Sequence, residues 1–263
     1  DTGTNINDCV ARDRSRIVNG TTTNFSSASA GSQASVQLLN STGTTVVFST
    51  VVLPAADGSW SWDLTGISLA DGTYQIRANI VDSSGNIVST GTVRTLTIDA
   101  TAPTTTVDIT AISQDSGLST SDFITNDNNG LTISATLSAA LGAGEALFYS
   151  RDNGATWTDI TASVSGTTVS HADSGLTQTS TIQMQVRDTA GNAGATDSQL
   201  VTIDTAAPTT SVDITAISQD TGVSANDFIT SDNDGLTISA TLSAALGTGE
   251  ALFYSRDNGT TWT

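Results

Sequence analysis

The 263-residue sequence predicts an all-β fold in which similar domains follow one another along the chain. Three observations lead to this prediction: a long internal repeat, short β-rich segments between turn residues, and an acidity that consists almost wholly of Asp. Hydrophobic residues make up 37% of the sequence, which is enough for packed cores. No apolar run is long enough to cross a bilayer, so we expect no membrane insertion.

The internal repeat fixes the length of one domain. The segment PTTTVDITAISQD, which starts at Pro103, returns as PTTSVDITAISQD at Pro208. Further along, LFYSRDNG at 147–154 returns at 252–259, with the same offset of 105 residues (103 to 208). A period of this length is the size of one immunoglobulin-like β-sandwich.

Each full repeat contains β-rich segments but no convincing amphipathic helix. Clusters of Gly, Asn, Asp and Ser separate the segments, as is typical of turns. We name the expected strands A, B, C, C′, E, F and G, and they cover residues 105–112, 131–137, 146–150, 156–160, 167–170, 181–187 and 196–203. The fold class is therefore all-β, with tandem immunoglobulin-like Greek-key β-sandwich repeats in an extended array.

The first hundred residues are a more distant copy of the repeat. One spacing of three aspartates occurs in all three copies: Asp1, Asp8 and Asp13; Asp115, Asp122 and Asp127; Asp220, Asp227 and Asp232. The segments IDATAP and IDTAAP, which end at Pro103 and Pro208, mark two junctions. We expect a repeat at 1–100 that lacks its first strand, a complete repeat at 101–205 and a truncated repeat at 206–263.

The charge of the chain points toward calcium and away from nucleic acid. There are 26 acidic and 8 basic residues, and Glu145 and Glu250 are the only glutamates. Asp is the acid of turns, where its short side chain bonds the main chain, and of calcium loops. A net charge of −18 repels phosphate, so we expect no nucleic-acid partner and no binding to anionic membranes.

The aspartates concentrate at the predicted junctions. Successive strands alternate in direction, so A–B turns lie at the C-terminal pole of a sandwich, whereas B–C and F–G turns lie at the N-terminal pole. The first junction then gathers Asp1, Asp8, Asp13, Asp99, Asp188 and Asn192, with Glu145 nearby. The second junction gathers Asp115, Asp122, Asp127, Asp204 and Glu250. Asp82 and Asn86 form the equivalent F–G turn of the first repeat and are candidate ligands as well.

Such converging carboxylates favour Ca²⁺, which takes six to eight oxygen ligands in flexible geometry. The alternative is that each Asp is an ordinary turn residue that stays solvated. Asp108 and Asp213, at equal positions in strand A, are either further ligands or part of a solvated strand face. The segment 126–130 resembles the start of an EF-hand loop, but no acid closes it and no helices flank it.

Several motifs together resemble the bacterial Ig-like repeats of large type I-secreted RTX adhesins and biofilm-associated proteins. They are the linker Ile-Asp-x-x-x-Pro, the F–G turn Asp-x-x-Gly-Asn, Asp57-Gly-Ser-Trp and Leu69-Ala-Asp-Gly-Thr-Tyr. The resemblance implies a calcium-dependent spacer on the bacterial cell surface, in contact with neighbouring repeats. It also implies that other domains bind the host-cell or biofilm ligand. Arg12, Arg14 and Arg16 crowd the first acidic cluster and depart from this pattern.

Three further features have structural interpretations. Ser150-Arg-Asp-Asn-Gly-Ala-Thr-Trp157 fits an Asp-box, which we place in the C–C′ hairpin as a brace in which Asp caps the turn. His171, the only histidine, is expected in a solvated turn. Cys9 allows no intrachain disulfide, and because it takes the place of Phe123 and Phe228 we expect a mostly buried core residue.

Two other classes of function compete with the spacer. A carbohydrate- or protein-binding Ig-like module needs an exposed aromatic cluster apart from the brace residues, which the sequence does not offer. A hydrolase needs a nucleophile and an oriented base, for which no constellation is present. We therefore expect no enzyme.

Overall fold

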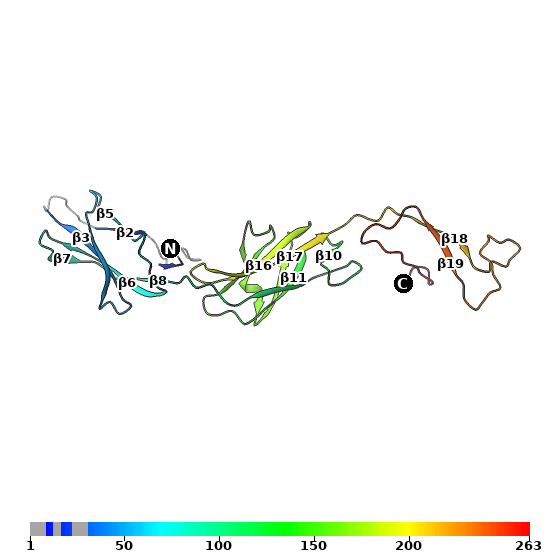
Figure 1. Ribbon diagram of the computed structural model, residues 1–263, viewed down its shortest axis with the longest axis horizontal. Helices are drawn as coiled ribbons and strands as arrows, with labels where there is room; N and C mark the ends of the chain where they lie inside the picture. Colours follow the sequence, from blue (N-terminus) through cyan, green and yellow to red (C-terminus); the bar gives the residue numbers. More distant parts are fainter. Residues whose placement is uncertain (1–8, 13–16, 23–30) are drawn as a thin grey trace.

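The computed structural model describes residues 9–12, 17–22 and 31–263. We call residues 1–100, 101–205 and 206–263 the first, second and third units. Figure 1 shows the three units in line along the longest axis of the molecule, in agreement with the predicted extended array. Within the described residues, no helix has the length and apolarity that crossing a membrane requires.

The second unit consists of two β-sheets. The first has the order β14-β15-β11-β9 and contains β9 (Val107–Ile112), β11 (Leu131–Leu137), β14 (Val164–Ser165) and β15 (Thr168–Asp173). The other has the order β10-β17-β16-β12-β13 and contains β10 (Ile124–Thr125), β12 (Ala146–Ser150), β13 (Thr158–Asp159), β16 (Ser180–Arg187) and β17 (Ala193–Ile203). A short 3-10 turn, η1 (Thr161–Ser163), precedes β14.

The two sheets pack face to face around one apolar core. Along β11, burial alternates residue by residue, because successive side chains of a strand point to opposite faces. Ile133 faces inward and is fully buried, as are Ile182 and Met184 from β16 of the opposite sheet. The predicted immunoglobulin-like sandwich is therefore confirmed.

Most predicted strands of the second unit are present. Strands B and C match β11 and β12 residue for residue. Strand E is longer than expected, since β15 pairs with β11 as far as Asp173. The prediction that His171 lies in a turn is wrong, because its main chain pairs with that of Ile133.

The first unit repeats this architecture with a larger sheet. That sheet has the order β1-β8-β6-β3-β4, with β7 paired to β6. Its strands are β1 (Val10–Ala11), β3 (Gln33–Leu39), β4 (Val46–Val52), β6 (Gly72–Val81), β7 (Ile87–Thr90) and β8 (Arg94–Ile98). The opposing pair is β2 (Ile17–Thr21) with β5 (Ser59–Asp63), and Val36, Leu38 and Leu64 are fully buried between the sheets.

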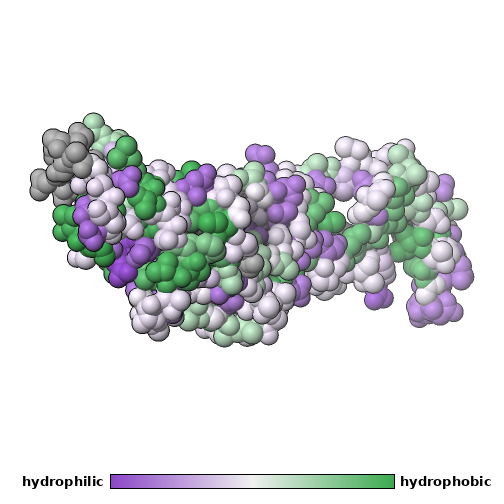
Figure 2. All heavy atoms as spheres, turned by 60° about the vertical axis from the view of Figure 1, so that its left-hand side comes forward, coloured by the Kyte–Doolittle hydropathy of each residue, from purple (hydrophilic) through white to green (hydrophobic). Residues whose placement is uncertain are grey.

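The third unit shows two paired strands, β18 (Val212–Ile217) and β19 (Ile238–Leu242). Its apolar residues are largely exposed: Leu252 is 52% exposed and Trp262 61%, whereas Leu147, the equivalent of Leu252, is fully buried in the second unit. Figure 2 shows green apolar side chains at the surface of this unit, on the right of the view. Up to Thr263 the third unit has no counterpart of β15, β16 and β17, which cover these positions in the second unit.

Candidate functional site

The A–B loop of the second unit holds its first aspartate in a defined turn. Gln114 and Phe123 both have positive φ angles, of 55° and 61°, which bulky side chains rarely adopt. The carboxylate of Asp115 stabilises this shape, because its Oδ2 accepts a 2.9 Å hydrogen bond from the Phe123 amide. The hydroxyl of Thr125 closes the loop by donating to the carbonyl of Gln114 at 2.6 Å.

The third unit forms the same loop. The Phe228 amide donates to Asp220 Oδ2 at 3.1 Å, and Thr230 donates to the Gln219 carbonyl at 2.6 Å. This repetition shows that the loop is determined by its own sequence, since the packing around it differs between the two units.

In the first unit, Asp1, Asp8 and Asp13 lie outside the described residues. Cys9 nevertheless has a φ of 59°, and its carbonyl accepts from Thr97 as that of Phe123 accepts from Thr202.

The A–B loop lies against the end of the last strand, as predicted. β10 pairs in parallel with β17, and the Asp204 amide donates to the Thr125 carbonyl at 2.8 Å. The first unit has the same arrangement, in which β1 pairs with β8 and the Asp99 amide donates to the Ala11 carbonyl at 3.0 Å. The linker aspartates Asp99 and Asp204 therefore each lie beside an A–B loop.

The junction carboxylates mostly act as local turn caps. Asp122, Asp127, Asp99 and Asp204 each accept from the amide two residues further along, at 2.9–3.1 Å. Glu145 and Glu250 accept from the amides of Gly142 and Gly247 within their own B–C turns, both at 2.8 Å. Among the described residues, no group of three His, Cys, Asp or Glu side chains is arranged to hold a metal ion. The convergence of Asp115, Asp122, Asp127, Asp204 and Glu250 at the second junction is therefore not present as a preformed site.

In the A–B loops that the structure describes, three carboxylate oxygens lack a donor. Oδ1 of Asp115, Oδ1 of Asp220 and Oδ2 of Asp232 are buried without a hydrogen-bond partner. Two of them are equivalent atoms in successive repeats. Burial of an unsatisfied carboxylate oxygen is unfavourable, so each of these atoms is suited to accept from water or to bind a cation.

The first junction is held by the F–G turn of the second unit. Asn192, which is 8% exposed, donates from Nδ2 to the Asp99 carbonyl at 2.8 Å and to Asp188 Oδ2 at 2.7 Å. Arg12 donates to the Gly191 carbonyl at 3.0 Å. The predicted orientation of this turn toward the preceding unit is present, with Asp99, Asp188 and Asn192 in one contact.

The equivalent turn of the first unit is formed by Asp82 and Asn86. The Asn86 side chain donates to Asp82 Oδ2 at 3.0 Å, and this bond lowers the pKa of the Asp82 carboxyl. Asn86 is exposed and Asp82 is half-buried. This turn therefore has the same local structure as the turn formed by Asp188 and Asn192. In the described part of the chain, no preceding linker lies against it.

Asp71 is a junction residue that the sequence analysis missed. Its carboxylate accepts from the Thr101 hydroxyl at 2.6 Å and from the Ala100 amide at 3.2 Å. Asp71 lies between β5 and β6, in the E–F turn, and alternating strand directions put this turn at the C-terminal pole where the linker leaves, so position alone could have identified it. The first linker is thus bonded from both sides, by Asp71 and by Asn192.

The Asp-box hairpin forms between β12 and β13 as predicted. Asp152 Oδ1 accepts from the Ser150 hydroxyl and the Thr156 amide, while Trp157 donates to the Gly154 carbonyl at 3.0 Å. The bonds from Thr156, followed by those from Ser150, lower the pKa of Asp152 to about 2. The guanidinium of Arg187 lies over the Trp157 ring at 5.0 Å and over the Phe148 ring at 4.6 Å.

A buried polar network connects the two sheets of the second unit, and the sequence analysis did not anticipate it. Asp173, 8% exposed at the end of β15, accepts from the Tyr149 hydroxyl at 2.9 Å and from Arg151 at 2.8 Å. Burial, followed by the nearby Asp173 charge, raises the pKa of Tyr149. His171 packs beside Tyr149 with ring centroids 4.9 Å apart, and burial lowers its pKa. These groups stabilise the sandwich, and Asp173 is already fully engaged.

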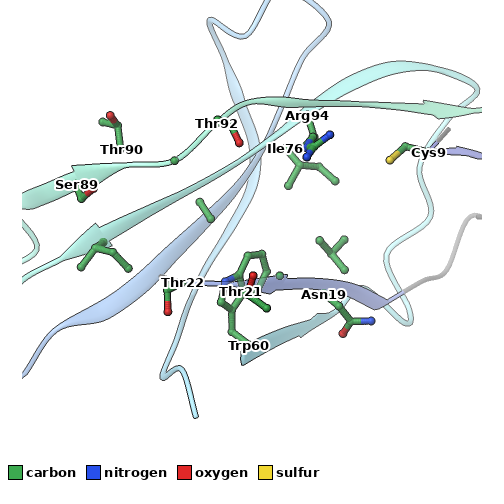
Figure 3. A pocket seen from close by; sticks show the side chains of 15 residues that line it. Cys9, Asn19, Thr21, Thr22, Trp60, Ile76, Ser89, Thr90, Thr92 and Arg94 are labelled. Carbon is green, nitrogen blue, oxygen red and sulfur yellow. The ribbon is translucent and has the colours of Figure 1, made fainter. Parts of the chain in front are cut away.

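Cys9 is exposed, so the prediction that it is mostly buried is wrong. It lies at one end of a cavity of about 510 Å³ between β2–β5 and the opposing sheet, with Trp60 and Arg94 on facing walls (Figure 3). In the second unit the corresponding space is filled by β9, whose Val107 and Ile109 are buried against the core. The described part of the first unit has no such strand, so the cavity stays open and Cys9 is uncovered.

Comparison with known proteins gives one family match. Residues 1–100 match the model of the family described as bacterial Ig-like domain. Among curated proteins, none matches the chain.

Solved structures give weaker likenesses. The fibronectin(III)-like modules of CbhA from Clostridium thermocellum are 17% identical, with a TM-score of 0.42, over 74% of this chain and 87% of that one. The BSP domain of a biofilm associated protein is 15% identical, with a TM-score of 0.25, over 75% of this chain and 29% of that one. A DUF3823 family protein from Bacteroides ovatus is also 15% identical, with a TM-score of 0.25, over 72% of this chain and 99% of that one. These values are too low to bear on function.

Proposed function

We propose that this chain is a spacer, or stalk, segment of a bacterial surface adhesin, in which calcium stiffens the junctions between Ig-like repeats. It works outside the cell, where it carries other domains toward a host-cell or biofilm surface in cell adhesion or biofilm formation. The segment itself is not catalytic. Large type I-secreted adhesins are the kind of protein in which we expect it.

One observation carries the proposal: the side chain of Asn192 bonds the main chain of Asp99 across the first junction. Asn192 belongs to the repeated turn Asp-x-x-Gly-Asn, and Asp99 to the repeated linker. The sequence features common to the repeats therefore stabilise the junctions and the hydrophobic cores, as expected of a stalk. The first linker is accordingly partly buried, whereas 204–209 is exposed.

We propose that calcium binds at the junctions because the A–B loops offer carboxylate oxygens, which this ion prefers as ligands. Asp115 keeps one buried carboxylate oxygen without a donor, and Asp220 repeats this. Asp115, Asp122, Asp127 and Asp204 would hold an ion at the second junction, and Asp1, Asp8, Asp13, Asp99, Asp188 and Asn192 at the first. Bound calcium supplies charge neutralisation and links loop to linker. Because these carboxylates cap separate turns without the ion, binding has to draw them together.

A calcium titration tests this proposal. Wild type is compared with Asp115→Asn, which keeps the acceptor for the Phe123 amide but removes the charge, and with Asp108→Asn as a control of equal charge change on strand β9. We expect wild type and Asp108→Asn to bind calcium by calorimetry and to gain about 2.7 kcal/mol per site at a hundred times the dissociation constant. Asp115→Asn should lose one site while its melting in chelator stays unchanged. Equal binding by all three proteins would contradict the assignment.

A further inference from the structure

The outer strand β4 of the first unit presents an unprotected sheet edge. β4 pairs with β3 on one side, and the described part of the chain places no strand on its other side. Its seven residues, VVFSTVV, include neither charge nor proline. Val47 is 41% exposed and Val51 53%. The strand has one irregularity, a bulge between Val46 and Phe48, and the rest of this apolar, uncharged edge readily pairs with another strand.

The equivalent edge of the second unit is protected. There the outer strand β13 has two residues, Thr158 and Asp159, and the hairpin leading to it carries Asp152. Short length and charge are the usual means by which a sheet edge avoids pairing. The same structural position is therefore closed to pairing in one unit and open to it in the other.

Charge also singles out this region. The chain carries a net charge of −18, so two copies repel each other over most of their surface. No charged residue occurs between Arg16 and Asp57, which is the stretch that contains β4. Two copies can approach along this edge without bringing like charges together.

We propose that β4 is a self-association site, where the strand pairs antiparallel with β4 of a second copy of this chain and Ser49 lies at the two-fold axis. The sequence VVFSTVV is nearly palindromic about Ser49. In this register Val46 faces Val52, Val47 faces Val51 and Phe48 faces Thr50. Every β-branched or aromatic side chain then meets an apolar or β-branched partner, which is the favourable kind of cross-strand pair.

The faces of the strand agree with this register. Phe48 and Thr50 pair with Leu38 and Val36, whose side chains point into the core, so Ser49 and Val51 lie on the outer face, while the bulge takes Val47 out of this alternation. Two-fold pairing brings Ser49 and Val51 of both copies onto one outer face. If the pairing shifted by one residue, inward-facing side chains of one copy would lie beside outward-facing side chains of the other. The register centred on Ser49 is therefore preferred. The β4–β4 dimer joins two spacers side by side, and its formation does not depend on calcium.

Disulfide trapping tests the register. In a Cys9→Ser background, Ser49→Cys places two thiols directly opposite each other, at about 4.5–5.5 Å between Cα atoms, which a disulfide can span. Val51→Cys is the matched control, because its two copies lie four residues apart, about 13 Å. We expect Ser49→Cys to form a covalent dimer under mild oxidation and Val51→Cys to remain monomeric. Equal cross-linking of both variants, or of neither, would overturn the proposal.

Sedimentation velocity of the full chain tests the association itself. Wild type should shift from monomer to dimer as concentration rises, in calcium and in chelator alike. Ser49→Lys places two like charges opposite each other and should abolish the dimer, whereas Ser170→Lys, an exposed strand residue in the second unit, should not. A wild type that stays monomeric contradicts the proposal. A dimer that survives Ser49→Lys contradicts it as well, and points to the exposed apolar face of the third unit.

Discussion

The side chain of Asn192 donates a 2.8 Å hydrogen bond to the main-chain carbonyl of Asp99, and this bond connects the F–G turn of the second unit to the linker of the first. The Asp188 carboxylate orients the same amide group at 2.7 Å. Asp71 bonds the linker from the other side. The linker is thus positioned by three short polar side chains, none of which belongs to a hydrophobic core.

Replacement of Asn192 by Ala should loosen the first junction. The variant loses the bonds to Asp99 and Asp188; a fully buried carbonyl left without a donor costs about 1–3 kcal/mol, and the partly buried Asp99 carbonyl should cost an amount toward the lower end. We expect faster amide exchange and faster proteolysis at 99–103. Asn86→Ala is the matched control, because Asn86 makes the same internal bond to Asp82 without contacting a linker. Linker protection that is unchanged in Asn192→Ala would show that the bond does not hold the junction.

Tyr149→Phe should destabilise the second unit by about 1–3 kcal/mol, because a buried carboxylate oxygen of Asp173 loses its donor. The amide signals of β11, followed through urea denaturation, report this change. Tyr74→Phe removes a hydroxyl bonded to the Ala70 carbonyl near solvent and should cost less. Similar effects of the two substitutions would mean that the inter-sheet bond contributes little.

The Asp152 carboxylate should stabilise its hairpin in a pH-dependent way. Its pKa falls from 3.8 to about 2 in the folded protein, so the ionised form is favoured by folding. This contribution is fully present above about pH 4 and is lost as the pH falls through about 2. Asp152→Asn should therefore melt at a lower temperature than wild type at pH 7. At pH 2 the difference between the two melting temperatures should be smaller. A difference that stays constant with pH argues against the assignment, and NMR titration of Asp152 gives its midpoint directly.

Local patterns predicted the strands of the fold well. β11 and β12 match expectation because their alternation and turn residues are strong local signals. β10 was missed, since Ile124 and Thr125 are a strand only through pairing with β17 far along the chain. The 3-10 turn and β14 are likewise too short to show a period.

The candidate site was predicted less completely than the fold. Asp spacing identified loops that recur with the same hydrogen bonds, as Asp115 and Asp220 show. Residue type also predicted that many acids cap turns. The distances between side chains of different loops depend on how those loops pack, which spacing along the sequence does not encode. Cys9 shows the same limit, because its backbone matches that of Phe123 while its exposure depends on a strand from elsewhere in the sandwich.

Small-angle scattering of the chain, in calcium and in chelator, tests the central claim most directly. Each sandwich adds about 40 Å to the length, from strands that rise roughly 3.3 Å per residue together with their turns and linker. The account predicts a longer maximum dimension and a rod-like profile in calcium, and a shorter, flexible profile in chelator, with both cores still folded. Asp99→Asn and Asp204→Asn should each reproduce the chelator profile at one junction. An equally long and equally rigid particle in both conditions would contradict calcium stiffening and leave the aspartates as ordinary turn residues.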